Sequence, residues 1–192
     1  MIVNHDRKVI FVSVPKTAST SINIAFDIHA HSSPKIHHSS IKEILENHPE
    51  CSSYFKFGFV RNPWDRMVSC YLNGVQDLSH RDEWSKGLLE YENFCDFVCH
   101  FERSIWKDWI HFLPLSHFLK IDGEIAVDVI GRFENLVEDF GSIKSKIGLT
   151  KGLAHSRKSK RENNYKEYYN DHTRDIIENF YKEDIETFGY EF

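Results

Sequence analysis

The feature of this sequence that most restricts its fold is a pattern that occurs twice: an apolar run, a polar turn and then a segment with helical character. In the first copy the apolar run covers residues 8–14, the polar loop residues 15–21 and the expected helix residues 22–28. In the second copy the run covers residues 55–60 and ends at Arg61. Such runs of β-branched and aromatic residues, stopped by polar turns, are typical of buried strands in a parallel sheet covered by helices.

The rest of the chain continues this alternation of strands and helices. Ser40 and Glu43 have the spacing of a capping box, which predicts a helix start at that point. We expect two helices within residues 91–112, short strands at 117–120 and 124–133, helices over 135–147 and 173–188, and a mobile loop over 150–168. The sequence therefore predicts an α/β fold, a three-layer sandwich with a central parallel sheet. With 192 residues the chain has the length of one domain, residues 1–192.

The segment after Arg61 predicts a helix with two distinct faces. Asn62 is a favourable N-cap and Pro63 a favourable first helical residue. One face is apolar and is expected to pack on the core; it carries Trp64, Met67, Val68, Tyr71 and Leu72. Another side is polar; it carries Asn62, Arg66, Ser69 and Asn73. We therefore expect Arg61 at the strand end and Ser69 two turns along the helix to converge on one ligand.

The composition is that of an ordinary globular protein, with 41% hydrophobic and 28% charged residues. A net charge of −5 argues against a surface that binds nucleic acid. The first apolar run is too short to cross a bilayer, so we expect no membrane insertion and a cytoplasmic protein. The cysteines lack the paired spacing of a zinc ribbon and are expected to be reduced; they are Cys51, Cys70, Cys95 and Cys99.

The loop at residues 15–21 has the chemistry of an anion site. A loop between a strand and a helix N-terminus offers unpartnered backbone N–H groups and a favourable helix dipole. This loop also contributes the ammonium of Lys16 and a set of hydroxyls, those of Thr17, Ser19, Thr20 and Ser21. It lacks the G-x-x-x-x-G-K-[ST] pattern of a Walker A loop, which removes the main support for nucleoside triphosphate hydrolysis. The alternative interpretation is an ordinary capped turn with a solvated lysine.

A second anion site is predicted at the second strand–helix junction. Arg61 is always charged and can make forked hydrogen bonds to a phosphate, and Ser69 adds a hydroxyl. Two such sites indicate a ligand with two phosphate groups. The alternative is that Arg61 pairs with a carboxylate such as Asp65 and that Ser69 is only a small helix residue.

These two segments resemble motifs of a known enzyme family. The run Pro15-Lys-Thr-Ala-Ser-Thr-Ser-Ile22 resembles the 5′-phosphosulfate loop of sulfotransferases that use 3′-phosphoadenosine-5′-phosphosulfate (PAPS). The run Phe59-Val-Arg-Asn-Pro-Trp-Asp-Arg-Met-Val-Ser-Cys-Tyr71 resembles their 3′-phosphate motif. The chain is most similar to carbohydrate sulfotransferases, which include heparan sulfate 2-O- and chondroitin sulfotransferases, and to their short bacterial and viral relatives. The likeness extends to residues 130–140 and 184–192, and it implies a P-loop NTPase-like sulfotransferase fold.

The resemblance implies a set of donor-binding residues. Lys16 would contact the phosphosulfate near its bridging oxygen, within a cradle formed by Thr17, Ala18, Ser19, Thr20 and Ser21. Many relatives have glycine where this chain has Ala18. Arg61 and Ser69 would hold the 3′-phosphate. Ser159 and Lys160, in the basic stretch at residues 155–161, would belong to a flap over the donor; a solvated flexible loop is the alternative there.

The resemblance also indicates how an acceptor hydroxyl would lose its proton. Histidine suits general-base work near neutral pH, and His38 stands where related enzymes have a histidine before a short helix. His37 is adjacent and is an alternative base. A zinc site built from the histidines at positions 29, 31, 37 and 38 is disfavoured, because they lack the usual helical or cysteine-paired spacing.

The sequence thus predicts a PAPS-dependent sulfotransferase that transfers a sulfuryl group to a hydroxyl, releases 3′,5′-ADP and requires no metal. The acceptor would be a glycan or a small molecule, since no residue distinguishes a sugar hydroxyl from an alcohol or a phenol. Two alternatives stay open: a catalytically inactive nucleotide-binding protein on the same fold, and a small-molecule kinase. Nothing in the sequence predicts an oligomeric state.

Overall fold

The computed structural model describes residues 2–27, 38–76, 86–153 and 164–192. The chain divides into two compact units, each built from two separate stretches of sequence. Unit 1 comprises residues 1–61 and 114–157, and unit 2 comprises residues 62–113 and 158–192. In the described part of the chain, no helix combines the length and the apolar character that a membrane crossing requires.

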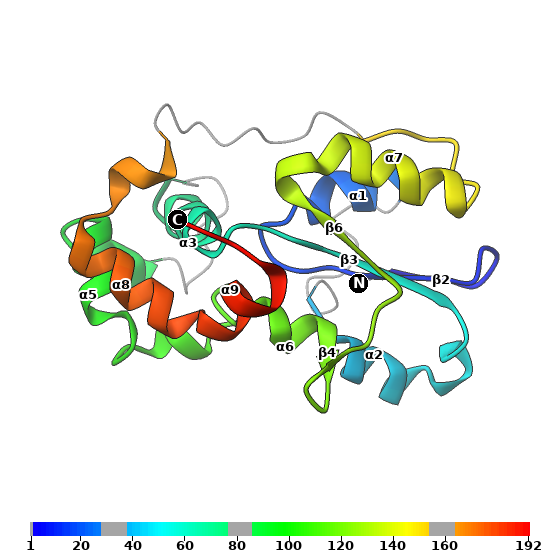
Figure 1. Ribbon diagram of the computed structural model, residues 1–192, viewed down its shortest axis with the longest axis horizontal. Helices are drawn as coiled ribbons and strands as arrows, with labels where there is room; N and C mark the ends of the chain where they lie inside the picture. The colour runs from blue at the N-terminus through cyan, green and yellow to red at the C-terminus, as the bar shows by residue number, and fades with distance from the viewer. Residues whose placement is uncertain (1, 28–37, 77–85, 154–163) are drawn as a thin grey trace. The chain divides into compact units, whose positions relative to one another are not determined.

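Unit 1 contains the sheet (Figure 1). Its strands are β1 (Ile2–Asn4), β2 (Val9–Val12), β3 (Phe55–Val60), β4 (Lys120–Ile121), β5 (Glu124–Ile125) and β6 (Val129–Arg132). Its helices are α1 (Ser19–Ala25), α2 (Ile41–Asn47), α6 (Leu115–Leu119) and α7 (Leu136–Lys146), with short 3-10 turns η1 (Pro49–Cys51) and η4 (Phe133–Asn135).

The main sheet has four strands in the order β1-β2-β3-β6. The pairs β2–β3 and β3–β6 are parallel, with Val12 opposite Gly58 and Val60 opposite Arg132. The predicted α/β fold with a central, mostly parallel sheet is therefore confirmed. Strand β1 pairs with β2 in the antiparallel direction. The sequence did not predict this strand, because three residues are too few to show a period of two.

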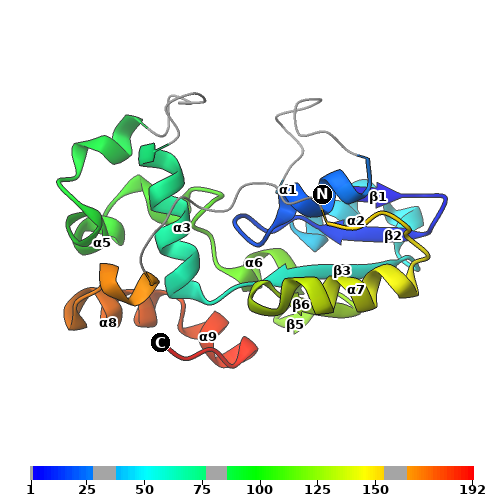
Figure 2. The same ribbon diagram turned by 90° about the horizontal axis from the view of Figure 1, so that it is seen from above.

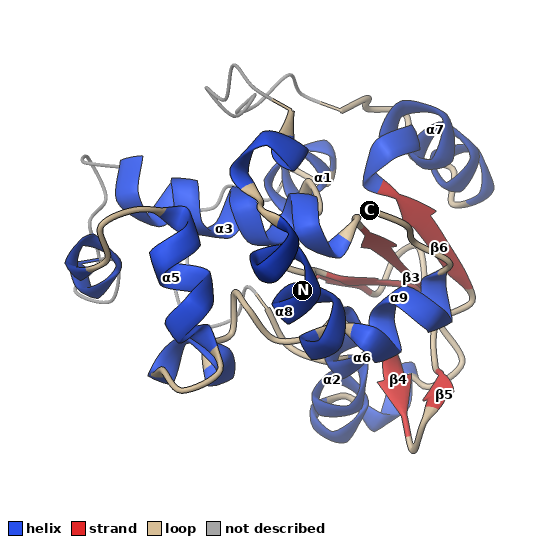
Figure 3. Ribbon diagram, turned by 60° about the vertical axis from the view of Figure 1, so that its left-hand side comes forward, coloured by secondary structure: helices blue, strands red, loops and turns tan. Residues whose placement is uncertain are grey.

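Helices cover both faces of this sheet. Figure 1 shows α1 and α7 over one face, where Ile22 and Phe140 join a buried cluster with Phe11 and Phe57 of the strands. It shows α2 and α6 over the other face. Helix α6 lies directly on β3, since a Cβ atom added at Gly58 would be 2.6 Å from the Cδ2 atom of Leu119. The β4–β5 hairpin forms a separate two-stranded sheet (Figure 3).

The local signals for helix starts and ends are confirmed. The Ser40 hydroxyl accepts the N–H of Glu43 at 3.2 Å, and the Glu43 carboxylate accepts the N–H of Ser40 at 2.8 Å, which completes the capping box of α2. Gly148, two residues after the end of α7 at Lys146, has a left-handed φ of +64°. Arg7 donates hydrogen bonds to the carbonyls of Ile147 and Gly148, beyond α7, at 3.1 Å and 2.6 Å.

Several predicted boundaries are wrong. Helix α1 begins at Ser19 rather than at residue 22, so part of the predicted loop is its first turn. Residues 115–119 form a helix, not a strand, because Leu115, Phe118 and Leu119 follow a helical spacing that buries all three. The predicted strand at 124–133 is two strands that belong to different sheets, β5 and β6; just before β6, the Asp128 carboxylate accepts the N–H of Lys56 at 2.7 Å.

Unit 2 is helical. Its elements are α3 (Pro63–Gln76), α5 (Phe94–Phe101), α8 (Asp171–Phe180) and α9 (Lys182–Phe188), with 3-10 turns η2 (Gly87–Glu90), η3 (Ile105–Asp108) and η5 (Tyr165–Tyr168). Figure 2 shows α5 and α8 beside α3. The side chain of Asn62 accepts the N–H groups of Trp64 and Asp65 at 3.1 Å and 3.3 Å, which confirms the predicted cap of α3.

The unit also corrects three sequence predictions. Of the two helices expected within residues 91–112, one is α5 and the other is only the short turn η3. The predicted loop at 150–168 ends in the ordered turn η5. The helix predicted over 173–188 begins earlier, capped by Asn170, and is broken at Tyr181. This break is fixed by packing, because the Tyr181 side chain is buried and its hydroxyl donates to the Phe112 carbonyl at 2.6 Å.

The polar side of α3, on which the sequence places Arg66 and Ser69, is buried at both of these residues. Arg66 is only 1% exposed. Its guanidinium donates hydrogen bonds to the carbonyls of His111 at 3.2 Å and Leu113 at 2.6 Å, and it lies 5.3 Å from the centre of the Tyr181 ring. Arg66 therefore holds the 111–113 turn in unit 2 and serves the structure.

We predict that Arg66→Ala lowers the free energy of unfolding by about 3 kcal/mol, because it removes a charged donor from each of the carbonyls of His111 and Leu113 and takes the aliphatic stem out of the core. Urea or thermal unfolding measures this change. Lys182→Ala is the control: the Lys182–Glu186 pair is exposed and 3.8 Å apart, and its loss should cost no more than about 0.5 kcal/mol. Equal effects of the two substitutions would contradict the structural role of Arg66.

Candidate functional site

The candidate site lies in unit 1, where three neighbouring parallel strands end. Loop 15–18 follows β2, Arg61 follows β3 and Phe133 follows β6. Because the strands run in the same direction, their carboxyl ends meet at one edge of the sheet, which is where ligands bind in open α/β folds. Arg61 contacts both of the other segments.

Loop 15–18 has an unusual backbone held by its own side chains. Lys16 and Ala18 both have left-handed conformations, with φ of +65° and +69°. The buried hydroxyl of Thr17 donates to the Val14 carbonyl at 3.0 Å, and the hydroxyl of Ser19 donates to the same oxygen at 2.5 Å. These two hydroxyls, predicted from the sequence as ligand contacts, thus fasten the loop to the end of β2.

Arg61 joins this loop to the neighbouring strands. Its side chain is only 5% exposed. One guanidinium nitrogen, Nη1, donates to the Lys16 carbonyl at 3.0 Å, and the guanidinium carbon lies 4.0 Å from the centre of the Phe133 ring. This cation–π contact and hydrogen bond hold the guanidinium in one orientation beside the loop.

His38 reaches the same edge from the segment before α2. Its Nδ1 atom lies 2.7 Å from the carbonyl oxygen of Ser13. A carbonyl can only accept a hydrogen bond, so Nδ1 carries the proton and Nε2 of the neutral ring carries the lone pair. The imidazole is therefore held in the tautomer whose Nε2 atom can accept a proton.

The predicted site residues fall into four groups. The structure brings together Lys16, Thr17, Ala18, Ser19, Arg61 and His38 through the contacts just described. Thr20 and Ser21 lie in the first turn of α1. Ser69 is buried in α3 of unit 2. Ser159, Lys160, the alternative base His37 and the other two histidines of the rejected zinc set lie outside the described residues.

Sequence reasoning missed the groups that position these side chains. Phe133 provides the face under Arg61, and the carbonyls of Ser13 and Val14 accept from His38 and from the loop hydroxyls. Backbone carbonyls carry no sequence signal. Phe133 directly follows an apolar strand, and in the sequence an aromatic residue at such a position is equally typical of core packing.

The chain was compared with models of known protein families. The model of a family described as "Sulfotransferase family" matches residues 1–191, which include both strand–loop–helix junctions and both units. The chain belongs to this sulfotransferase family. An uncharacterized protein of Archaeoglobus fulgidus is 29% identical to it over 122 residues, which cover 59% of this chain and 83% of that protein. No solved structure matches the chain.

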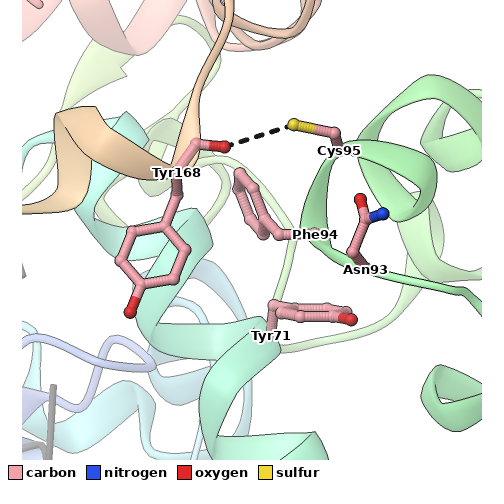
Figure 4. A pocket seen from close by; sticks show the side chains of 5 residues that line it. All are labelled: Tyr71, Asn93, Phe94, Cys95 and Tyr168. Carbon is pink, nitrogen blue, oxygen red and sulfur yellow. Dashed lines mark hydrogen bonds between the residues drawn. The ribbon is translucent and has the colours of Figure 1, made fainter.

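Unit 2 of this sulfotransferase contains a separate open pocket of about 420 Å³ (Figure 4). Its lining comes from α3, the start of α5 and η5; the residues are Tyr71, Asn93, Phe94, Cys95 and Tyr168. The Cys95 thiol donates to the Tyr168 carbonyl at 3.3 Å, and burial, followed by the charge of Asp96, raises the pKa of Tyr71. Among the described residues, the lining is uncharged, and it is aromatic apart from the amide of Asn93 and the thiol of Cys95.

We predict that Ala18→Gly raises the free energy of unfolding by about 1 kcal/mol, because glycine adopts a left-handed conformation without the steric cost that alanine has there. Ala25→Gly is the matched control within α1: Ala25 is fully buried and helical, and glycine should lower the free energy of unfolding by about 1 kcal/mol or more. If the loop stores strain, chemical denaturation of the two variants will give changes of opposite sign in the free energy of unfolding. The same sign for both would contradict this.

Proposed function

We propose that this sulfotransferase uses PAPS as its donor and transfers the sulfuryl group to a hydroxyl of a carbohydrate or another small molecule. The observation that carries the proposal is the hydrogen bond of 3.0 Å from Arg61 to the Lys16 carbonyl. It joins the segment that resembles a phosphosulfate loop to the segment that resembles a 3′-phosphate motif. A donor with phosphate groups at both ends of its adenosine matches this pairing of cationic residues.

The side chains present fit such a donor. Lys16 and Arg61 are cations on adjoining segments, and the hydroxyl-rich first turn of α1 follows directly. Donor groups of this kind stabilise phosphate oxygens through charge-assisted hydrogen bonds. In our proposal Lys16 neutralises the charge that develops on the leaving phosphate, within a cradle of Thr17, Ala18, Ser19, Thr20 and Ser21.

The other end of the donor is assigned by resemblance. Arg61 and Ser69 hold the 3′-phosphate, and Ser159 and Lys160 contribute to a flap over the donor. Arg61 has structural support for this role, since its stacking on Phe133 and its bond to Lys16 orient the guanidinium before any ligand binds.

His38 acts as the general base in this proposal. The bound donor supplies the sulfuryl group and a phosphate leaving group. As the acceptor oxygen forms its bond to sulfur and the bond from sulfur to the bridging oxygen breaks, Nε2 of His38 takes the acceptor proton. The hydrogen bond from Nδ1 to the Ser13 carbonyl leaves Nε2 as the nitrogen that accepts the proton, and it stabilises the imidazolium that results.

We propose that the transfer itself needs no metal ion. A sulfuryl group carries less charge than a phosphoryl group, and Lys16 and Arg61 already provide positive charge at the predicted donor site. We further propose one sulfotransferase domain over residues 1–192, which the extent of the family match supports, acting in the cytoplasm on a glycan or small-molecule acceptor without binding nucleic acid. The net charge of −5 supports the last point.

Calorimetric titration with 3′,5′-ADP, the expected product, tests the donor site. We predict tight binding to the wild type, binding about 10- to 100-fold weaker for Arg61→Ala, and a similar loss for 5′-AMP on the wild type, because each change removes one charge-assisted contact to the 3′-phosphate. Arg103→Ala, at an exposed arginine of unit 2, is the matched control and should bind like the wild type.

The 5′-AMP comparison keeps this test valid if Arg61→Ala unfolds. Equal affinities for 3′,5′-ADP and 5′-AMP would refute a site for the 3′-phosphate. ATP binding tighter than 3′,5′-ADP would favour a kinase, and tight 3′,5′-ADP binding without turnover on any acceptor would indicate an inactive nucleotide-binding protein.

We predict that His38→Gln lowers the turnover rate about 10²- to 10⁴-fold with PAPS, while the affinity for 3′,5′-ADP changes little, since glutamine cannot accept the acceptor proton. Transfer of labelled sulfate and calorimetry measure the two quantities separately. His117→Gln, at an exposed position of α6, is the control and should retain turnover. Normal turnover of the His38→Gln variant would refute His38 as the base and would indicate that His37 or another group accepts the proton.

A further inference from the structure

A second cluster of chemically active side chains lies at the other end of the strands of unit 1. His5 is in the turn before β2, and Glu50 and Cys51 are in η1, before β3. The ligating atoms of these three residues all lie within 4.8 Å of one another. The proposed donor site uses none of them, because Lys16 and Arg61 follow the same two strands at their carboxyl ends.

The geometry of the cluster is close to that of a tetrahedral metal site. The Cys51 Sγ atom lies 3.9 Å from His5 Nδ1 and 3.6 Å from Glu50 Oε1. Ligand bonds of 2.0–2.3 Å at tetrahedral angles would place such atoms about 3.3–3.6 Å apart. The two distances from the Cys51 Sγ atom are therefore within a few tenths of an ångström of those in a tetrahedral site, and the third pair of ligand atoms lies within 4.8 Å.

The surroundings of the cluster orient its members. His48 Nδ1 lies 3.5 Å from Glu50 Oε1, and backbone hydrogen bonds of 2.9 Å from Cys51 to His48 and from Tyr54 to Cys51 hold the segment in tight turns. The Tyr54 hydroxyl lies 3.0 Å from His5 Nδ1 and would be displaced from that nitrogen by an ion. His5 and Glu50 are exposed, so a solvent molecule can take a fourth position, whereas Cys51 is fully buried.

The donor set selects the class of ion. An imidazole nitrogen, a carboxylate oxygen and a thiolate sulfur together suit Zn²⁺, whereas Mg²⁺ and Ca²⁺ prefer oxygen ligands alone. A thiolate next to a carboxylate is unfavourable unless a cation lies between them, and Zn²⁺ provides that charge.

We propose that His5 Nδ1, the Glu50 carboxylate and the Cys51 thiolate form a structural Zn²⁺ site with an exposed fourth position. His48 is a positioning residue that orients the carboxylate of Glu50. The ion ties the turn between β1 and β2 to the segment that leads into β3. It stabilises the amino-terminal edge of the sheet and takes no part in sulfuryl transfer.

The test uses the whole chain, treated with a chelator and then titrated with Co²⁺ as a spectroscopic probe and with Zn²⁺ by calorimetry. We expect one ion per chain, a thiolate-to-cobalt charge-transfer band, displacement of Co²⁺ by Zn²⁺, and a higher melting temperature with Zn²⁺. Cys51→Ala should lose the band, and the exposed Cys99→Ala, its matched control, should keep it. A band that persists in Cys51→Ala, or no band in the wild type, would overturn the site.

Glu50→Gln provides a second test that does not depend on a buried position. It should weaken Zn²⁺ binding by roughly tenfold or more, as should His48→Ala through loss of its orienting contact. Tyr54→Phe should keep full affinity, because the phenol is not a ligand. Unchanged affinity in Glu50→Gln, or lost affinity in Tyr54→Phe, would refute the assigned ligands, while 3′,5′-ADP binding reports independently on the donor site.

Discussion

The guanidinium of Arg61 is the group on which the candidate site depends. The Arg61 side chain is only 5% exposed. A buried charge is unfavourable unless polar and aromatic contacts replace the water that it loses. Here the Lys16 carbonyl and the Phe133 ring provide those contacts. Because one partner follows β2 and the other follows β6, Arg61 at the end of β3 links the segments that follow all three strands. The group that we assign to the donor is thus also the group that shapes the loops around it.

The strain in loop 15–18 has a compensating set of contacts. Two non-glycine residues with positive φ each cost free energy, and such conformations persist only where the surroundings determine them. Three hydrogen bonds fix this loop: Thr17 and Ser19 donate to the Val14 carbonyl, and Arg61 donates to the Lys16 carbonyl. A loop held in this way loses little further conformational entropy when an anion binds, which favours both affinity and accurate placement of Lys16.

The sequence predicted those parts of the structure that depend on neighbouring residues. The capping box at Ser40, the cap at Asn62 and the bounds of β3 rest on local chemistry, and all are confirmed. The unbroken helix predicted over 173–188 was wrong, and the partners of Arg66 were not predicted, because the Phe112 carbonyl and the 111–113 turn are distant in sequence from these residues. Within the site, the sequence predicted which side chains carry charge, and the structure added the carbonyls and the ring that orient them.

The two ends of the strands in unit 1 show how a parallel sheet separates different chemistries. At the carboxyl ends, cations and hydroxyls surround a loop that suits anions; at the amino ends of β2 and β3, a thiol, an imidazole and a carboxylate suit a cation. The buried residues of β2 and β3 lie between these sets. An ion at the amino edge would stiffen the turn before β2 without placing positive charge beside Lys16. Stability and transfer would then be supplied by different residues of the same two strands, so that a change in one set need not disturb the other.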